Sequence, residues 1–234
     1  MTPAGLQAAI GYRFQSPSLL EQALTHRSCG GSNNERLEFL GDGLLNAVIG
    51  AALYELRPRD DEGALSRLRA SLVREATLAG IARGFELGGL LRLGESERKT
   101  GGHRRDSILS DALEALLGAI WLDGGFEVAQ RCCLDWFAAR LQALPDPESL
   151  KDPKTRLQEW LQGQGLALPH YQVLAADGPP HRRRFTVRCT LNGDPRQAEA
   201  DAGSRREAEQ RAARLLLEQL GVVMRPAPQE NGDA

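Results

Sequence analysis

The sequence predicts a multi-domain, mainly α protein. An all-helical domain spans residues 1–144, and a small α+β domain of order α-β-β-β-α spans residues 154–223. Residues 1–144 read as successive helices with short Gly or Pro breaks and no convincing strand. Three prolines within residues 145–153 forbid a continuous helix and favour an extended linker. After this linker, the apolar residues alternate at period two, which is typical of strands.

In the helical domain, residues 34–49 predict a helix with acids on one face. At about 100° per residue, Glu35, Glu38 and Asp42 share that face, and Phe39 lies beside them. The opposite face carries Leu37, Leu40, Leu44 and Val48. A helix that is apolar nearly all round is buried, and buried carboxylates need a metal or another cation to hold their charge.

A second acidic helix is predicted over residues 106–120. Asp111 and Glu114 share one of its faces, which also carries the small residues Ala115 and Gly118. These small residues would let another helix or a ligand come close. Two such helices could together form a cluster of four carboxylates, and all-oxygen sites of this kind suit Mg²⁺ or Mn²⁺ rather than zinc.

The second domain is expected to begin and end with a helix. Residues 154–162 predict the first helix, residues 171–175, 184–190 and 197–202 predict three strands, and residues 204–220 predict the last helix. The buried face of the last helix is expected to carry Ala208, Ala212, Leu215, Leu216 and Leu220. Pro195 cannot donate to a strand ladder, which leaves the register of the second hairpin open. The Pro-rich tail, residues 224–234, is expected to be disordered.

The composition narrows the class of protein. The net charge is −2; residues 1–150 carry 16 Lys and Arg against 20 Asp and Glu, and the remainder carries 13 against 11. Any contact with nucleic acid must therefore come from local placement of charge rather than from bulk attraction. No apolar run approaches the ~20 residues that span a membrane, and no secretory signal is visible. The four cysteines lack metal-ligand spacing, so we expect reduced, buried thiols in a cytoplasmic protein.

An ordered series of motifs resembles the ribonuclease III family, the endonucleases of double-stranded RNA. The acidic run of residues 34–42 is similar to the family signature, and the likeness covers roughly residues 5–222. It continues in residues 23–28, 61–70, 99–102 and 107–116.

The resemblance implies a metal-dependent phosphodiester hydrolysis. Two divalent ions about 3.5–4 Å apart can activate a water molecule and stabilise the leaving oxygen. The implied metal ligands are Glu38, Asp42, Asp111 and Glu114, of which Asp42 and Glu114 are the catalytic pair, and Mg²⁺ is the implied cofactor, with Mn²⁺ as a substitute. Glu35 and Glu62 match lower-ranked acidic positions. The family's products carry a 5′-phosphate and a 3′-hydroxyl with a short 3′ overhang, and its members process ribosomal and messenger RNA.

The last domain resembles a double-stranded-RNA-binding domain, a fold that reaches two successive minor grooves over about 16 base pairs. The likeness lies in the first helix, in the loop between the first two strands, and at the start of the last helix. Arg205 and Arg206 sit where a helix N-terminus already favours phosphate. The implied RNA-binding residues are Thr155, Gln158, His181, Ser204, Arg205 and Arg206.

Cutting both strands of a duplex needs two sites, whereas this chain has one set of four acids and no internal repeat. A symmetric homodimer would supply the second site. Phe39, on the acidic side of its helix, is the candidate anchor of that interface, because the matching aromatic residue in the family fills a cavity of the partner. The alternative is that Phe39 is an ordinary core residue.

Two other functions compete with the nuclease. A binding module would grip duplex RNA without cutting it, but such a protein would be free to lose Asp42 and Glu114. A helical carboxylate oxidase of the ferritin-like type would need Glu-x-x-His pairs, and neither acidic helix has one.

Overall fold

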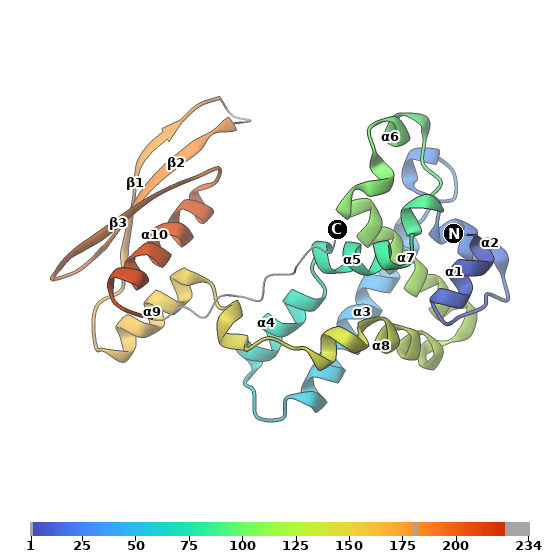
Figure 1. The fold of residues 1–234 in the computed structure, drawn as a ribbon, viewed down its shortest axis with the longest axis horizontal. Helices are drawn as coiled ribbons and strands as arrows, with labels where there is room; N and C mark the ends of the chain where they lie inside the picture. Colours follow the sequence, from blue (N-terminus) through green and yellow to red (C-terminus); the bar gives the residue numbers. More distant parts are fainter. Residues whose placement is uncertain (1, 180–181, 223–234) are drawn as a thin grey trace. The chain divides into compact units, whose positions relative to one another are not determined.

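The computed structural model describes residues 2–179 and 182–222, and its chain divides into two compact units, residues 1–144 and 145–234 (Figure 1). The expected all-helical domain followed by an α-β-β-β-α domain is confirmed. His181 and the tail over residues 224–234 lie outside the described residues.

The first unit is built around one central helix. The α-helices are α1 (Pro3–Ala9), α2 (Pro17–Ala23), α3 (Glu35–Leu56), α4 (Glu62–Leu72), α5 (Glu75–Gly84), α6 (Glu95–Lys99), α7 (Asp106–Gly124) and α8 (Phe126–Gln142). Short 3₁₀ turns are η1 (Arg27–Cys29), η2 (Leu87–Gly89) and η3 (Gly102–Arg104). Helix α7 is buried on nearly all sides between Ile108 and Ile120, and α2, α3, α5 and α8 pack around it (Figure 1).

Helices α3 and α7 meet backbone to backbone at two glycines. A Cβ atom added to Gly41 would lie 1.8 Å from the carbonyl oxygen of Glu114. A Cβ atom added to Gly118 would lie 2.2 Å from the carbonyl oxygen of Leu37. No side chain fits between the helices here, so the expected close approach at Gly118 is made by α3. The contact brings the acidic residues of the two helices to the same place.

Helix α3 differs in part from the amphipathic helix expected of it. Leu37, Leu44 and Val48 are buried as expected, but Leu40 is half-buried and Phe39 is 83% exposed. By length and composition alone α3 could cross a membrane. Its buried residues pack against α7 instead, which makes it a core helix of this unit.

The expectation of four buried thiols is wrong for Cys29, which is exposed, although all four cysteines are free.

The second unit packs two helices against an antiparallel sheet of order β1-β2-β3 (Figure 1). The strands are β1 (His170–Asp177), β2 (Arg184–Leu191) and β3 (Asp194–Ala202), and the helices are α9 (Pro153–Gly163) and α10 (Arg205–Gln219). Leu157 and Leu161 of α9, Cys189 of β2 and Leu216 of α10 share one core.

Strand β3 is longer than expected and begins at Asp194 rather than at residue 197. Pro195 is tolerated because β3 is an edge strand, where a missing N–H costs no inner ladder bond. The register of the β2–β3 pair, which the sequence left open, shifts between Thr190 and Leu191, so that Leu191 pairs with Asp194.

Leu215 is 41% exposed, so its expected place on the buried face of α10 is wrong.

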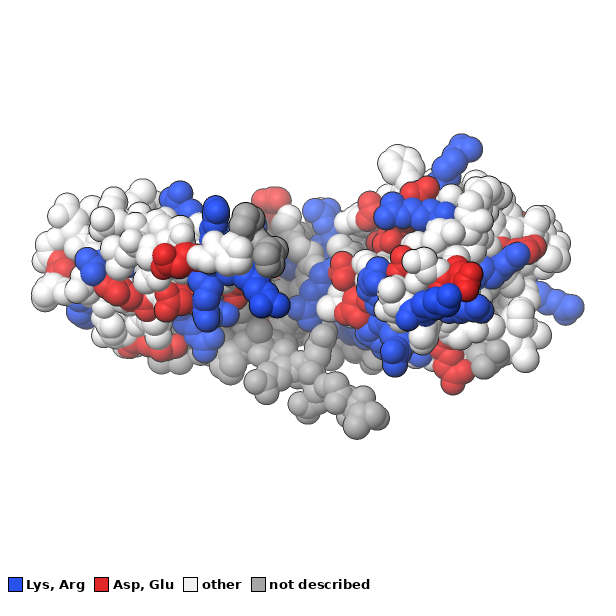
Figure 2. All heavy atoms as spheres, turned by 90° about the horizontal axis from the view of Figure 1, so that it is seen from above, with Lys and Arg blue, Asp and Glu red and all other residues white. Residues whose placement is uncertain are grey.

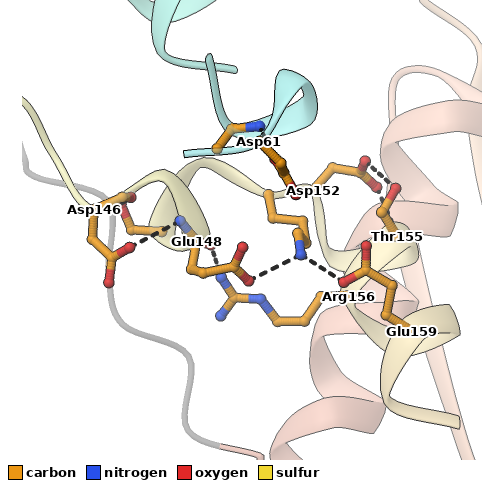
Figure 3. Close-up of polar contacts among 10 residues, drawn as sticks. Asp61, Asp146, Glu148, Asp152, Thr155, Arg156 and Glu159 are labelled. Carbon is orange, nitrogen blue, oxygen red and sulfur yellow. Dashed lines mark hydrogen bonds and ion pairs between the residues drawn. The ribbon is translucent and has the colours of Figure 1, made fainter. Parts of the chain in front are cut away.

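The segment expected to be an extended linker over residues 145–153 is not extended throughout. Pro147–Leu150 forms a 3₁₀ turn, η4, and Pro153 already begins α9. The Lys151 ammonium group lies 2.9 Å from a Glu148 carboxylate oxygen and 2.6 Å from one of Glu159, so it ties the turn to α9 (Figure 3). Arg156 also donates to the Glu148 carbonyl oxygen. One ion pair, from Lys151 to Glu159, and one hydrogen bond, from Arg156 to Glu148, therefore hold this segment against α9.

Candidate active site

Three carboxylates from α3 and α7 come together at the glycine contact. One oxygen each from Glu38, Asp111 and Glu114 lie within 4.8 Å of one another. Glu38 is one helical turn before Asp42 on α3, and Asp111 is one turn before Glu114 on α7, so the two acidic faces oppose each other. Three of the four expected metal ligands are thus in one group.

Asp42, the fourth expected ligand, lies at the border of this group. Its side chain is exposed, and its Oδ1 accepts a hydrogen bond from Asn46 Nδ2 at 2.8 Å. Its charge nevertheless reaches the cluster, because it contributes to the raised pKa of Glu114.

The cluster is electrostatically unfavourable by itself. Burial raises the pKa of Glu114 to about 8, with further contributions from Asp42, Asp111 and Glu38. Burial and the charge of Asp111 raise the pKa of Glu38. Burial also raises the pKa of Asp111, although the nearby His26 partly offsets it. Carboxylates that repel one another in a partly buried place are stabilised in their charged form by a cation.

A polar hollow of about 170 Å³ opens beside the cluster. It is lined by His26, Arg27, Asn34, Glu35, Glu38 and Asp111. Glu35 faces Arg27 across 3.4 Å, so it lies at the rim of the cluster rather than within the group of three. Glu62, the other lower-ranked acid, is exposed at the start of α4 and accepts a hydrogen bond from Ser66 Oγ.

The donor set fits a hard divalent cation. Three carboxylates supply oxygen ligands only, which Mg²⁺ and Mn²⁺ prefer. Among the described residues, no cysteine joins the group, and His26 holds its Nδ1 against Ser28. The geometry therefore suits the metal that the sequence resemblance implies.

Phe39 lies beside a second, apolar hollow of the same unit. This hollow measures about 610 Å³ and is lined by Gln22, Glu35, Arg36, Leu37, Phe39, Leu40 and Leu122. Leu122 is 59% exposed, so both the aromatic ring and the wall beside it face outward. The alternative that Phe39 is a core residue does not agree with its 83% exposure.

Of the expected RNA-binding residues that the structure describes, two lie on α9, Thr155 and Gln158, and three lie at the start of α10, Ser204, Arg205 and Arg206. Asp152 caps α9 and accepts from both the backbone N–H and the hydroxyl of Thr155. Burial opposes ionisation of Asp152, but hydrogen bonds from Thr155 and Lys154 and the charge of Arg206 lower its pKa. Ser204 caps α10 by accepting from the Glu207 N–H.

Gln158, Arg205 and Arg206 are exposed. Glu209, a buried acid of α10, joins this surface to α9. Its carboxylate lies 2.8 Å from Arg205 Nε and 2.5 Å from Lys154 Nζ. Burial alone would raise the pKa of Glu209, but these two cations lower it.

On the visible face of both units, acidic and basic side chains are interspersed (Figure 2). This agrees with the nearly balanced charge of each half of the sequence.

Sequence reasoning missed three residues of these surfaces. Asn34 precedes α3 and reads as an ordinary helix cap, yet it lines the polar hollow. Gly41 reads as an unfavourable residue within a helix, yet it sets the α3–α7 distance. Glu209 reads as a solvated acid of α10, yet it is buried. A glycine inside a long helix was the one available signal, because it often has a packing reason.

Comparisons with known proteins agree with this arrangement. The family model described as "Ribonuclease-III-like" matches residues 16–141, and that described as "Double-stranded RNA binding motif" matches residues 153–220. "Ribonuclease 3" of Alkalilimnicola ehrlichii is 55% identical over 92% of this chain and 94% of its own length. "Ribonuclease 3" of Hahella chejuensis is 54% identical over 93% of this chain and 96% of its own.

A solved structure is similar to the first unit. The nuclease domain of ribonuclease III from Campylobacter jejuni is 44% identical, with a TM-score of 0.58, over 59% of this chain and 97% of that chain. The helical unit with its opposed acidic helices, the α-β-β-β-α unit and the near full-length likeness lead to one assignment. The chain belongs to the ribonuclease III family and is an endoribonuclease with a double-stranded-RNA-binding domain.

Proposed function

We propose that this endoribonuclease cleaves double-stranded RNA by two-metal-ion hydrolysis at the cluster of Glu38, Asp42, Asp111 and Glu114. The observation that carries the proposal is the approach of three carboxylates to within 4.8 Å, with raised pKa values for all three. Bound divalent ions would activate a water molecule and neutralise charge on the scissile phosphate. Mg²⁺ is the proposed cofactor, and Mn²⁺ can substitute.

The residues of the chain have distinct roles in this proposal. Glu38, Asp111 and Glu114 would hold the divalent ions from the two facing helices, and Asp42 would complete the set from the border of the group. Asp42 and Glu114 are the pair on which cleavage depends most. Glu35 holds Arg27 at the rim of the carboxylate cluster by an ion pair. Glu62, at the start of α4, contributes less to cleavage than the four metal ligands.

The second unit grips the duplex. We assign Thr155, Gln158, His181, Ser204, Arg205 and Arg206 to the RNA-binding surface, with the two arginines on phosphates at the start of α10. The products carry a 5′-phosphate and a 3′-hydroxyl with a short 3′ overhang. The cellular role is the processing of ribosomal RNA precursors and some messenger RNAs in the cytoplasm.

A homodimer supplies two sites for the two strands. Phe39 supplies an exposed ring and the apolar hollow beside it supplies a recess, so two copies of this patch could pair about a two-fold axis. In such a dimer each Phe39 ring fills the partner's hollow. The similar nuclease domain of Campylobacter jejuni ribonuclease III has a region involved in dimer formation, which supports the same assembly for this chain.

The cleavage proposal is tested with the pure protein on a long duplex RNA, with Mg²⁺ or with EDTA, beside single-stranded RNA and duplex DNA. We expect shortening of the duplex RNA alone and only with Mg²⁺. Glu114→Gln and Asp42→Asn should each slow cutting by about 100-fold or more, since a metal ligand matters at least as much as a residue behind one.

RNA affinity and the mass of the assembly should stay unchanged in both carboxylate variants. Cutting at the normal rate by both would show that the metal cluster is misplaced. A shifted but uncut duplex with the unmodified protein would favour the binding module.

The dimer is tested at Phe39. Phe39→Ala should raise the dimer dissociation constant at least about 30-fold, because truncating a central interface aromatic costs about 2 kcal/mol or more. Tyr54→Ala is the matched control, since Tyr54 is a 74% exposed aromatic residue of the same helix that does not line the hollow. Sedimentation analysis should give the control the unmodified constant, and equal behaviour of the two variants would contradict the interface.

A further inference from the structure

Asn34 occupies an unusual place at the start of α3. It is 2% exposed, and its backbone is fixed at both ends. Its N–H donates to the Thr25 carbonyl oxygen at 2.9 Å, and its carbonyl oxygen accepts from the Glu38 N–H at 2.8 Å. The residue is therefore held rigidly one helical turn before a carboxylate of the cluster.

The side chain of Asn34 does not cap the helix that it precedes. Its backbone is already in the right-handed helical region, and no hydrogen bond from α3 reaches its side chain. Asn33 caps instead, since its Oδ1 accepts from the Glu35 N–H at 3.0 Å. The usual reason for an asparagine at this position is thus absent.

The Asn34 amide is a buried donor without a partner. Its Nδ2 atom has no hydrogen-bond acceptor within the part of the chain that the structure describes. Buried polar groups are nearly always hydrogen-bonded, and an unsatisfied one costs free energy of folding. An unpartnered buried donor therefore needs a specific explanation, and a partner that a bound ion brings within reach is one such explanation.

The surroundings indicate which partner this is. Asn34 lines the same polar hollow as Glu38 and Asp111, two of the three carboxylates that approach one another. Carboxylates accept hydrogen bonds and must keep one orientation when they hold a cation. Residues behind a metal ligand commonly fix it by such a bond.

We propose that Asn34 is a positioning residue of the metal centre, and that its amide donates to a carboxylate of the Glu38–Asp111 pair when a divalent cation is bound. The inference rests on the proposed function of the cluster. In this role Asn34 acts through the carboxylates, where it fixes the orientation that the cation requires.

Two variants that differ in volume but both lack the donor test this role. Asn34→Leu keeps the Cγ-branched shape and the four heavy atoms of the side chain, whereas Asn34→Ala leaves a cavity. The dissociation constant of Mn²⁺ is measured on the full-length protein without RNA, from the electron paramagnetic resonance signal of free Mn²⁺. Thermal unfolding is followed in EDTA. Asn33→Ala is the matched control, because Asn33 is a neighbouring amide outside the hollow.

Both Asn34 variants should raise the Mn²⁺ dissociation constant by about 10- to 100-fold. In EDTA, Asn34→Leu should unfold at the same temperature as the unmodified protein or above it, because it removes an unsatisfied donor, while Asn34→Ala should unfold at a lower temperature. The control should bind Mn²⁺ normally. Weakened binding in the alanine variant alone would show a packing role and overturn the inference.

The same Mn²⁺ titration distinguishes a failure of this inference from a failure of the proposed metal centre. An unmodified protein that binds no Mn²⁺ would contradict the metal centre itself. An unmodified protein that binds Mn²⁺, with both Asn34 variants binding equally well, would contradict only the role of Asn34.

Discussion

Glu114 of α7 and Glu209 of α10 are both largely buried helical glutamates, yet their environments have opposite effects on them. The charged neighbours of Glu114 are Asp42, Asp111 and Glu38, and its pKa rises to about 8. The charged neighbours of Glu209 are Lys154 and Arg205, and its pKa falls below the ordinary value. Burial by itself would raise both.

This difference distinguishes a structural acid from a site that needs a cation. The second unit supplies its own cations, so Glu209 is part of a complete ion-pair network that joins α9 to α10. The first unit gathers carboxylates without enough positive charge to balance them, which lowers its stability. Such an arrangement is typical of functional sites.

The two units also differ in how their helices meet. The largest predicted effect concerns the backbone contact of α3 with α7 in the first unit. Gly41→Ala should destabilise the protein by about 3 kcal/mol or more, at the upper end of overpacking costs, because its Cβ would lie 1.8 Å from a backbone oxygen that cannot move aside. Gly43→Ala in the same helix meets nothing within 4 Å and should stabilise by about 0.5–1 kcal/mol.

Urea unfolding with EDTA measures both glycine variants. The Gly41 variant should also bind Mn²⁺ poorly, since α3 and α7 must separate. Equal stabilities for the two alanine variants would mean that the helices do not meet at Gly41.

The comparison of the two glutamates becomes sharper when each is made neutral. Glu209→Gln should destabilise the metal-free protein at pH 8.5 by about 1.5–3 kcal/mol, the contribution of hydrogen bonds to charged groups. Glu114→Gln should instead stabilise it, since it removes repulsion within the cluster. Thermal unfolding in EDTA gives both signs, and a destabilised Glu114 variant would contradict the electrostatic description of the cluster.

A further predicted effect is a pH dependence that belongs to the first unit alone. The pKa of Glu114 is about 8 when folded and about 4.5 when unfolded, so the folded chain binds more protons between these values. Metal-free stability should therefore fall as the pH rises from about 5 to 8. The unmodified protein and Glu114→Gln should unfold at similar temperatures at pH 5 and diverge above pH 7.

With Mg²⁺ present, the stability of the unmodified protein should no longer fall as the pH rises. Mg²⁺ should have no such effect on Glu114→Gln. The lowered pKa of Glu209 has the opposite sign, because its contribution is present above pH 4.5 and is lost only as the pH falls through its folded value. A metal-free stability that is flat between pH 5 and 8 would show that Glu114 titrates normally.

Much of this protein could be predicted from its sequence, for local reasons. The periodicity of apolar residues indicated the helices of the first unit and the strands of the second, because the side-chain period depends on the backbone alone. The same spacing placed Glu38 with Asp42, and Asp111 with Glu114, on single helix faces. The resemblance to ribonuclease III then implied the function of these residues.

Only the tertiary structure decided the rest, because it depends on contacts between distant segments. The glycine contact of α3 and α7 set which acids meet, placing Glu38, Asp111 and Glu114 in one group and Asp42 at its border. The place of Asn34 beside the polar hollow, and its burial there, also depend on the tertiary structure. Lys154, which lies 55 residues before Glu209 in the chain, helps to make Glu209 a structural acid. The pattern along a helix specifies a face, whereas the chemistry of a carboxylate depends on what packs against that face.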